Sequence, residues 1–281
     1  MARQISGRPD IKIALLQTPV DFDKQKNLDL ACKAIWEAAQ NGAKLVILPE
    51  MFCCPYSTRY FADYAEPAGG HIWQTLSHCA RENNICLVGG SFPEWEDGRI
   101  YNTCFVFGPD GKQLARHRKM HLFNVEFDGG QHFRESDTFT PGDDVTTFQY
   151  GEMTFGLCIC FDLRFPELSR LMTLMGAQAI IVPAAFNMTT GPRHWETMFR
   201  QRAVDDQVYT IGVAPARDEQ GVYVSYANSI LCDPMGQVLT RADAHPCILY
   251  GKLDAEQVDS ARRQLPLLSA RRTDLYTLQK R

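Results

Sequence analysis

Three residues, Glu50, Lys119 and Cys160, are suited to catalysis, because each is a reactive group that interrupts or ends an apolar segment. Cys160 ends the mainly apolar run 154–160, and Pro166 follows a few residues later. This pattern predicts a sharp turn from a strand into a helix, a position where nucleophiles are common. Because the amides of a helix N-terminus stabilise a thiolate, we expect the pKa of Cys160 to lie below the usual value of about 8.5. Such a thiolate can attack a carbonyl carbon.

Glu50 follows the apolar residues 45–49, which predict a buried strand that ends at this carboxylate. Sheets of α/β proteins form their binding sites at the carboxyl ends of such strands. Desolvation raises the pKa of a carboxyl group toward neutrality, which suits a general base. The alternative, that Glu50 only caps the next segment, stays open on strand position alone.

Lys119 belongs to the basic run 116–119, which has aromatic and apolar neighbours. A run of this kind is typical of a solvated face. A lysine placed inside a pocket would instead supply a fixed positive charge to a developing oxyanion, as acyl transfer requires. Spacing along the sequence does not decide between these two interpretations.

The elements that must position these residues form an alternation of apolar strands and amphipathic helices. Fully apolar strands separated by helices are typical of a sheet covered by helices, and we predict a large α/β protein with mixed sheets. We predict strands at 11–17, 45–48, 85–89, 101–107, 154–160, 179–182, 208–213, 223–226, 229–232 and 248–252, and helices at 27–39 with Asn27 as N-cap, 71–82, 166–175 and 193–205. A hairpin turn is predicted at 109–111, and 117–144 is predicted to be irregular.

The composition limits the classes of protein to consider. With 281 residues, 45% hydrophobic content and no Gly/Ser/Pro-rich linker, the sequence predicts a single domain over 1–281. Residues 262–281 have no regular pattern and are predicted to be an arm that packs on a second subunit. A net charge of −4 with scattered basic residues argues against a nucleic-acid partner. The apolar runs are shorter than the roughly 20 residues of a membrane span, and residues 1–10 lack the apolar segment of a secretion signal, so we expect no membrane association.

Ten cysteines are spread through a chain that is long enough to fold without disulfides. We therefore expect reduced, mostly buried thiols and a cytoplasmic location. The sequence contains no paired Cys-x-x-Cys sets with histidine partners, so we expect no metal. It also contains no glycine-rich nucleotide motif, so we expect no cofactor.

The sequence contains other residues that could form a nucleophilic site. A Cys-His pair has candidate bases in His117, His121, His132 and His194, but no local cysteine-protease signature surrounds Cys160. The thiols that could replace Cys160 are Cys53, Cys54 and Cys158. Cys158 falls on the same strand face as Cys160 and is better explained as a small buried hydrophobe.

Three motifs resemble those of the carbon-nitrogen hydrolase (nitrilase) superfamily in order and spacing. They are Leu-Pro-Glu at 48–50, Arg-Lys-Met-His-Leu-Phe at 118–123 and Cys-Phe-Asp-Leu-Arg-Phe-Pro-Glu at 160–167. A fourth segment, Phe-Arg-Glu-Ser at 133–136 ahead of Pro-Gly at 141–142, matches the family's second glutamate. The resemblance extends from residue 11 to residue 276. It implies a four-layer α-β-β-α sandwich and a homodimer or larger homo-oligomer.

The resemblance also implies a role for each catalytic position. Glu50 would be the general base, Lys119 the cation that stabilises the oxyanion, and Cys160 the nucleophile. Glu135 would orient Lys119 or assist proton transfer, and the backbone N–H of Phe161 would be a second oxyanion donor. The sequence departs from the family where Tyr usually follows the nucleophile, since Phe161 stands there, and where Gly often lies two residues before it.

Within the superfamily the sequence is most similar to the omega-amidase branch. The similarity lies at 185–196, 202–205 and 214–218. It implies hydrolysis of the terminal amide of 2-oxo acid amides such as 2-oxoglutaramate, through a cysteine thioester and with water as second substrate. The residues implied to bind the substrate are Arg164, Phe186, Asn187, Thr189, Arg193 and His194.

Pocket shape, rather than the catalytic group, decides which carbon-nitrogen bond is cleaved. The same motifs therefore leave open an N-carbamoyl amino acid, deaminated glutathione or a nitrile as the substrate. An inert binding protein on the same fold is the alternative of another class. The intact Glu50, Lys119 and Cys160 argue against it, and ammonia release from a small amide would separate the two.

Overall fold

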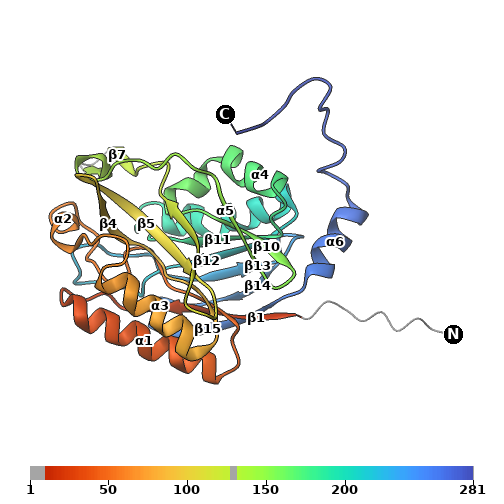
Figure 1. Cartoon of the computed structure of the whole chain (residues 1–281). Coiled ribbons are helices and arrows are strands. Elements are labelled where there is room, and N and C mark those ends of the chain that lie inside the picture. Colours follow the sequence, from red (N-terminus) through yellow and green to blue (C-terminus); the bar gives the residue numbers. More distant parts are fainter. Residues whose placement is uncertain (1–9, 127–131, 281) are drawn as a thin grey trace.

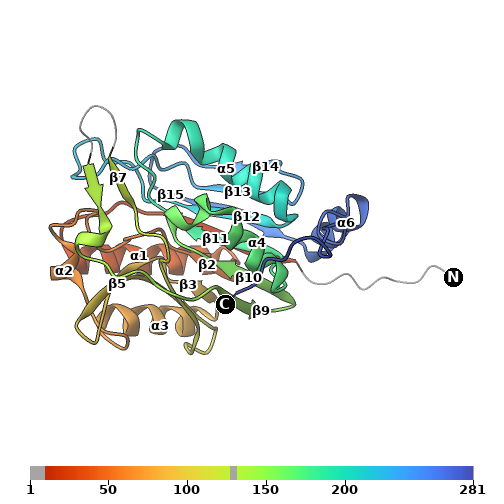
Figure 2. The same cartoon turned by 90° about the horizontal axis from the view of Figure 1, so that it is seen from above.

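The alternation of side chains along strand β1 (Ile11–Gln17) explains the layered architecture. Ile13 and Leu15 belong to one apolar cluster, which lies between two sheets, whereas Ala14 and Leu16 belong to another, which lies beneath helices. Successive side chains of a strand point to opposite faces, so a fully apolar strand must be covered on both. The computed structural model, which describes residues 10–126 and 132–280, meets this demand with two stacked sheets and helices outside them (Figures 1 and 2).

The described strands form two mixed sheets. The first has the order β15-β1-β2-β3-β5-β4, with β6 also paired to β5, and the second has the order β14-β13-β12-β11-β10-β9. The strands of the first are β15 (Cys247–Leu253), β1, β2 (Leu45–Ile47), β3 (Cys86–Val88), β5 (Arg99–Phe107), β4 (Phe92–Glu96) and β6 (Gln113–Arg118). Those of the second are β14 (Val238–Arg241), β13 (Ile230–Cys232), β12 (Tyr209–Val213), β11 (Ala179–Pro183), β10 (Met153–Leu157) and β9 (Thr146–Tyr150). A separate hairpin pairs β7 (Asn124–Glu126) with β8 (His132–Arg134).

Helices cover the outer face of each sheet. On the first sheet lie α1 (Lys24–Gln40) and α3 (His71–Asn83), and on the second lie α4 (Pro166–Leu174) and α5 (Gly191–Asp206) (Figure 1). The described chain also contains α2 (Phe61–Tyr64), α6 (Ala255–Gln264) and the 3₁₀ turns η1 (Glu135–Asp137) and η2 (Cys160–Arg164). The predicted four-layer α-β-β-α sandwich is confirmed. No helix among the described residues is long and apolar enough to span a bilayer.

Helix α1 begins earlier than predicted. Its N-cap is Asp23, whose carboxylate accepts hydrogen bonds from the backbone N–H groups of Gln25 and Lys26. The predicted cap, Asn27, lies one turn inside the helix, where its side chain binds the backbone of Asp21. The prediction of Asn27 as N-cap is therefore wrong, because an aspartate one turn earlier satisfies the free amides of the helix.

The parallel strands bring their carboxyl ends to a common edge of each sheet. In the first sheet β1, β2 and β3 run parallel, and in the second β10, β11 and β12 do so. Glu50 lies just beyond β2, and Cys160 lies just beyond β10. Loops at these strand ends therefore carry both residues, as expected for a site in an α/β protein.

Three predicted segments differ from the structure. The segment 117–144 is not irregular throughout, because it contains the hairpin of β7 and β8 and the turn η1. Residues 223–226 form no strand, and Ser225 makes only an isolated bridge to Asn187. The C-terminal segment is regular as far as Gln264, because α6 covers 255–264, and it is irregular from 265 onward. This last stretch exposes Leu275 and Tyr276, at 69% and 57% of their surface.

Candidate active site

A buried lysine lies between two carboxylates at the carboxyl edge of the sheets. Lys119 follows strand β6, and its Nζ lies 2.8 Å from Oε1 of Glu50 and 2.9 Å from Oε1 of Glu135. All three side chains are fully buried. The side chain of Lys119 is thus buried, although its basic neighbours are typical of a solvated face. Glu50 does not serve as a cap, since its carboxylate faces the ammonium group of Lys119. The structure brings these three predicted residues together.

A tyrosine completes the cluster. The hydroxyl of Tyr56 donates a hydrogen bond to Glu135 Oε1 at 2.7 Å and lies 3.4 Å from Lys119 Nζ. The other oxygen of Glu135 accepts a hydrogen bond from the backbone N–H of Phe123 at 2.6 Å. Glu135 is therefore held on both oxygens, which fixes the position of the charge that faces Lys119.

Glu50 has one occupied and one unoccupied oxygen. Oε1 accepts from Lys119 and, at 2.9 Å, from the amide of Asn102. Oε2 is buried and has no hydrogen-bond partner among the described residues. Burial raises the pKa of Glu50, although the charge of Lys119 opposes the rise. A carboxylate with a raised pKa and a free oxygen has the properties of a general base.

Lys119 keeps its positive charge in this environment. Burial by itself would lower the pKa of the ammonium group, but the negative charges of Glu135 and Glu50 outweigh it and raise the pKa above the usual range. A desolvated cation with a raised pKa is suited to stabilising negative charge that develops on a substrate.

Cys160 is the first residue of the turn η2, and its backbone is left-handed, with φ of 47°. This conformation is rare outside glycine and is found preferentially at functional sites. The thiol is 5% exposed. Burial raises the pKa of Cys160 well above its usual value, and the charge of Glu50 adds to the rise. The expectation of a lowered pKa is therefore wrong, because desolvation outweighs the short 3₁₀ turn.

Asp162 binds both the segment that carries Lys119 and the segment that carries Cys160. Its Oδ1 accepts from the backbone N–H and the ring of His121, both at 2.8 Å. Its Oδ2 accepts from the ring of His117 and from the backbone N–H of Ile159, both at 3.0 Å. Although burial opposes it, these hydrogen bonds hold the pKa of Asp162 well below its usual range.

This arrangement links the position of the cation to that of the thiol. His117 and His121 flank Lys119 by two residues on either side, and Asp162 follows Cys160 by two. Three of the four hydrogen bonds to Asp162 therefore bind the Lys119 segment to the turn of Cys160, and the fourth, from Ile159, lies within that turn. They also engage two of the four histidines considered as partners of Cys160 in a Cys-His pair.

We expect Asp162→Asn to lower kcat at least tenfold and the free energy of unfolding by about 2–4 kcal/mol, because an amide NH₂ would face N–H donors. The pKa of Asp162 is lower in the folded protein than in the unfolded chain. The ionised carboxylate therefore contributes its full stabilisation above about pH 4, and this stabilisation is lost as pH falls further. Urea denaturation between pH 7 and pH 3 should show a shallower loss of stability in the variant. Asp110→Asn, in an exposed turn, is the matched control. Unchanged kcat and stability in Asp162→Asn would contradict the proposed link.

Cys160 opens into a small cavity that includes several of the predicted substrate-binding residues. It is lined by Phe123, Cys160, Phe161, Arg164, Ala185, Phe186, Asn187 and Thr190. Thr189 is exposed and does not line this cavity, whereas its neighbour Thr190 does. Arg193 and His194 are also exposed and do not line this cavity, although Nδ1 of His194 lies 3.1 Å from Nη1 of Arg164, which does.

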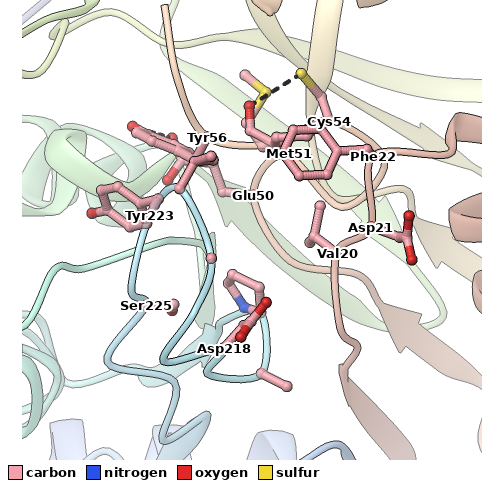
Figure 3. Close-up of a pocket in the computed structure, with 15 residues that line it drawn as sticks. Val20, Asp21, Phe22, Glu50, Met51, Cys54, Tyr56, Asp218, Tyr223 and Ser225 are labelled. Atoms are coloured by element: carbon pink, nitrogen blue, oxygen red, sulfur yellow. Dashed lines mark hydrogen bonds between the residues drawn. The ribbon is translucent and has the colours of Figure 1, made fainter.

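A second cavity of about 180 Å³ opens beside Glu50 (Figure 3). The loops after β1, β2 and β12 form its walls, and its charged lining residues are Asp21, Glu50 and Asp218. Tyr56 and Tyr223 also line it, with ring centroids 4.6 Å apart. Because Tyr56 is hydrogen-bonded to Glu135, this cavity reaches the Glu50–Lys119–Glu135 cluster itself.

Tyr56, Asn102 and Thr190 were not predicted from the sequence. Asn102 was detectable, because Asn102 and Thr103 are polar residues within the apolar strand β5, the same signal that marked Glu50. Tyr56 lies in an irregular loop that has no periodic pattern. Its position depends on tertiary packing, which no local signal predicts.

The other cysteines are free thiols. All ten lie in the described parts of the chain. Cys53, Cys54 and Cys158 are fully buried, and burial raises the pKa of each. Cys158 lies beyond the end of β10 within the apolar cluster between the sheets, as expected of a small buried hydrophobe. Within 10–126 and 132–280, no group of three or more His, Cys, Asp or Glu side chains is arranged to hold a metal ion.

The sequence matches the family model of carbon-nitrogen hydrolases over residues 12–263, and the chain belongs to this family. It is 47% identical over 268 residues to the omega-amidase NIT2 of Mus musculus, covering 95% of this chain and 97% of that protein. The structure is similar to that of Saccharomyces cerevisiae Nit3, a member of branch 10 of the nitrilase superfamily, with a TM-score of 0.86, 42% identity and coverage of 94% and 97%. It is also similar to a mutant amidase from Nesterenkonia sp. AN1 that carries the acetamide moiety of fluoroacetamide on its active-site cysteine, with a TM-score of 0.78, 26% identity and coverage of 98% of both chains.

Proposed function

We propose that this protein is an omega-amidase, which hydrolyses the terminal amide of short 2-oxo acid monoamides such as 2-oxoglutaramate and 2-oxosuccinamate to the acid and ammonia. The names of its relatives support this activity. The observation that carries the proposal is the buried Glu50–Lys119–Glu135 cluster, which faces Cys160, together with a desolvated arginine that lines the cavity of Cys160.

The first half of the reaction forms a thioester. Glu50 accepts the proton of the Cys160 thiol as the sulfur attacks the amide carbon. Because the pKa of the thiol is raised, proton transfer and attack must be closely linked. Lys119 and the backbone N–H of Phe161 stabilise the oxyanion, and Glu135 holds Lys119 in place. Glu50 then gives its proton to the departing nitrogen, which leaves as ammonia.

The second half hydrolyses the thioester. Glu50 takes a proton from a water molecule, whose oxygen attacks the thioester carbon, and the proton returns to the sulfur as the acid leaves. The cavity beside Glu50 provides room for water and ammonia next to the base. Each step uses groups of this chain and water.

Arg164 is suited to bind the carboxylate of the substrate. Its guanidinium lies 4.7 Å from the ring centroid of Phe186, and its hydrogen-bonding partners in the described parts of the chain are the neutral His194 ring and the sulfur of Met198. Burial lowers the pKa of Arg164. A partly desolvated cation that faces neutral groups favours an anionic ligand. Phe186 and Asn187 line the same cavity and would contact the remainder of the substrate.

We expect Arg164→Met to raise the KM for 2-oxoglutaramate at least tenfold and to leave the KM for neutral butyramide nearly unchanged. Methionine keeps much of the apolar stem that packs on Phe186 but removes the charge. Steady-state ammonia assays on both amides measure the difference. Arg81→Met, on the exposed surface of α3, is the matched control. An equal rise of KM for both amides would contradict a role in binding the carboxylate.

An ammonia-release panel tests the function itself. The amides 2-oxoglutaramate and 2-oxosuccinamate should give the highest kcat/KM, above deaminated glutathione, an N-carbamoyl amino acid and an aliphatic nitrile. Comparable or higher values for any of the last three would change the assigned substrate. No ammonia from any of them would favour the inert binding protein.

We also propose that the protein is a homodimer or larger assembly in the cytoplasm. The exposed apolar residues of the stretch after α6, Leu275 and Tyr276, support packing of this arm on a second subunit. Ten free cysteines suit a reducing compartment. Light scattering at micromolar concentration should give at least twice the mass of one chain, and a monomer would contradict the proposal.

A further inference from the structure

Two thiols outside the active site lie in direct contact. Cys32 on α1 and Cys79 on α3 have their Sγ atoms 2.9 Å apart. The two helices lie side by side on the outer face of the first sheet (Figure 1). The catalytic cluster, in contrast, lies at the carboxyl edge of the sheets, and neither thiol lines a cavity described above. The proposed amidase reaction therefore leaves this pair without a role.

The contact between the helices is in register along its length. Near the start of both helices, Gln25 Oε1 and His71 Nε2 are 3.0 Å apart. Cys32 follows seven residues after Gln25, and Cys79 follows eight residues after His71, about two helical turns in each case. The two contacts thus lie on one seam between parallel helices, so the thiols face each other because the helices are packed together.

The two thiols differ in exposure. Cys79 is 7% exposed and belongs to the apolar cluster beneath the helices, whereas Cys32 packs at the edge of that cluster and is partly exposed. The S–H of Cys79 points to the sulfur of Cys32. This hydrogen bond lowers the pKa of Cys32 and raises that of Cys79. A partly exposed thiol with a lowered pKa beside a second thiol is the arrangement found in peroxide-sensitive cysteines.

We propose that Cys32 and Cys79 are a peroxide-reactive pair that closes to an intramolecular disulfide between α1 and α3. The sulfur of Cys32 attacks one oxygen of hydrogen peroxide, the O–O bond breaks, and Cys32 becomes a sulfenic acid with release of water. The sulfur of Cys79 then attacks the sulfur of Cys32, and the hydroxyl leaves as a second water with the Cys79 proton. Two thiols are oxidised to one disulfide, and one peroxide is reduced to two waters.

The geometry requires little movement for this step. A disulfide has an S–S bond of about 2.05 Å, so the sulfurs must approach by less than 1 Å. Side-chain rotation on two helices that are already in contact supplies such a shift. The disulfide would close a loop of the chain between Cys32 and Cys79 that includes β2. Such a closed loop constrains the unfolded chain and thereby stabilises the fold.

Peptide mass spectrometry of the full-length protein tests the proposal. After hydrogen peroxide, alkylation and non-reducing digestion, we expect a linked peptide pair containing Cys32 and Cys79, lighter by two hydrogens than the separate thiol peptides. A dithiol reductant should restore both thiols. If both cysteines remain alkylatable at a peroxide dose that oxidises Cys160, the proposal is wrong. The readout is independent of catalysis, so it holds or fails separately from the amidase function.

Three variants separate a specific pair from general thiol oxidation. Cys79→Ser should leave Cys32 as a sulfenic acid that dimedone traps, and Cys32→Ser should leave Cys79 reduced. Cys247→Ser removes another partly exposed thiol and should keep the linked peptide in full. Circular dichroism establishes that each variant is folded. In the Cys160→Ala background, peroxide should raise the melting temperature, and an unchanged or lower value would contradict a bond between α1 and α3.

Discussion

Replacement of Cys160 by alanine should abolish ammonia release from every amide substrate and leave the fold intact. The change removes the sulfur that forms the thioester, and the remaining groups can bind the substrate but cannot form the acyl intermediate. Only one buried atom is lost, so the free energy of unfolding should change by about 1 kcal/mol. Ammonia assays and thermal unfolding of the purified variant measure both effects.

Cys158→Ala is the matched control for this prediction. Cys158 lies two residues earlier, is fully buried, and has a raised pKa for the same reason as Cys160. It lies apart from the Glu50–Lys119–Glu135 cluster, and its variant should retain at least half of the wild-type kcat. If Cys160→Ala still released ammonia, or if only Cys158→Ala lost activity, Cys160 would not be the nucleophile.

The fold was predictable where apolar residues form unbroken runs. Strand β1 was predicted with its observed bounds, 11–17, because its central residues are apolar on both faces, and both faces are covered in the structure. Strand β6 was not, since its sequence from Gln113 to Arg118 is largely polar and its position depends on pairing with β5. Helix α6 was also missed, because few of its residues are buried.

The residues of the candidate site were only partly predictable from local sequence signals. Single polar residues at strand ends marked Glu50 and Cys160, but the burial of Lys119 was not readable from a run of basic neighbours. Resemblance to the family, rather than spacing, linked it to the two carboxylates. The sequence also could not predict that Thr190 rather than Thr189 lines the cavity, because this depends on which side chain of the loop before α5 points toward the cavity.

The raised pKa of Cys160 changes the role expected of Glu50. A helix terminus that lowered the pKa would provide a resting thiolate, and the base would then be needed only for later steps. In the structure the thiol is desolvated and faces the charge of Glu50, so it is protonated at rest. In the proposed mechanism Glu50, whose own pKa is raised, therefore takes this proton during attack. The free Oε2 of Glu50 is the atom available to do so.

We expect Lys119→Met to lower kcat by about two orders of magnitude or more, as the loss of one oxyanion donor typically does. It should also lower the free energy of unfolding by about 3–5 kcal/mol, because two buried carboxylates lose their shared cation. Pre-steady-state ammonia release and urea denaturation measure the two effects. Lys112→Met, on an exposed turn, should change neither by a comparable amount.

A double variant separates the two effects of Lys119. In Lys119→Met/Glu135→Gln the second buried charge is gone as well, so repulsion with Glu50 disappears and part of the lost stability should return. The rate should not return, because the cation that stabilises the oxyanion is still absent. Recovery of kcat in the double variant would show that Lys119 acts only by balancing charge. If Lys119→Met alone altered KM and kept the wild-type kcat, this would likewise contradict a role of Lys119 in the transition state.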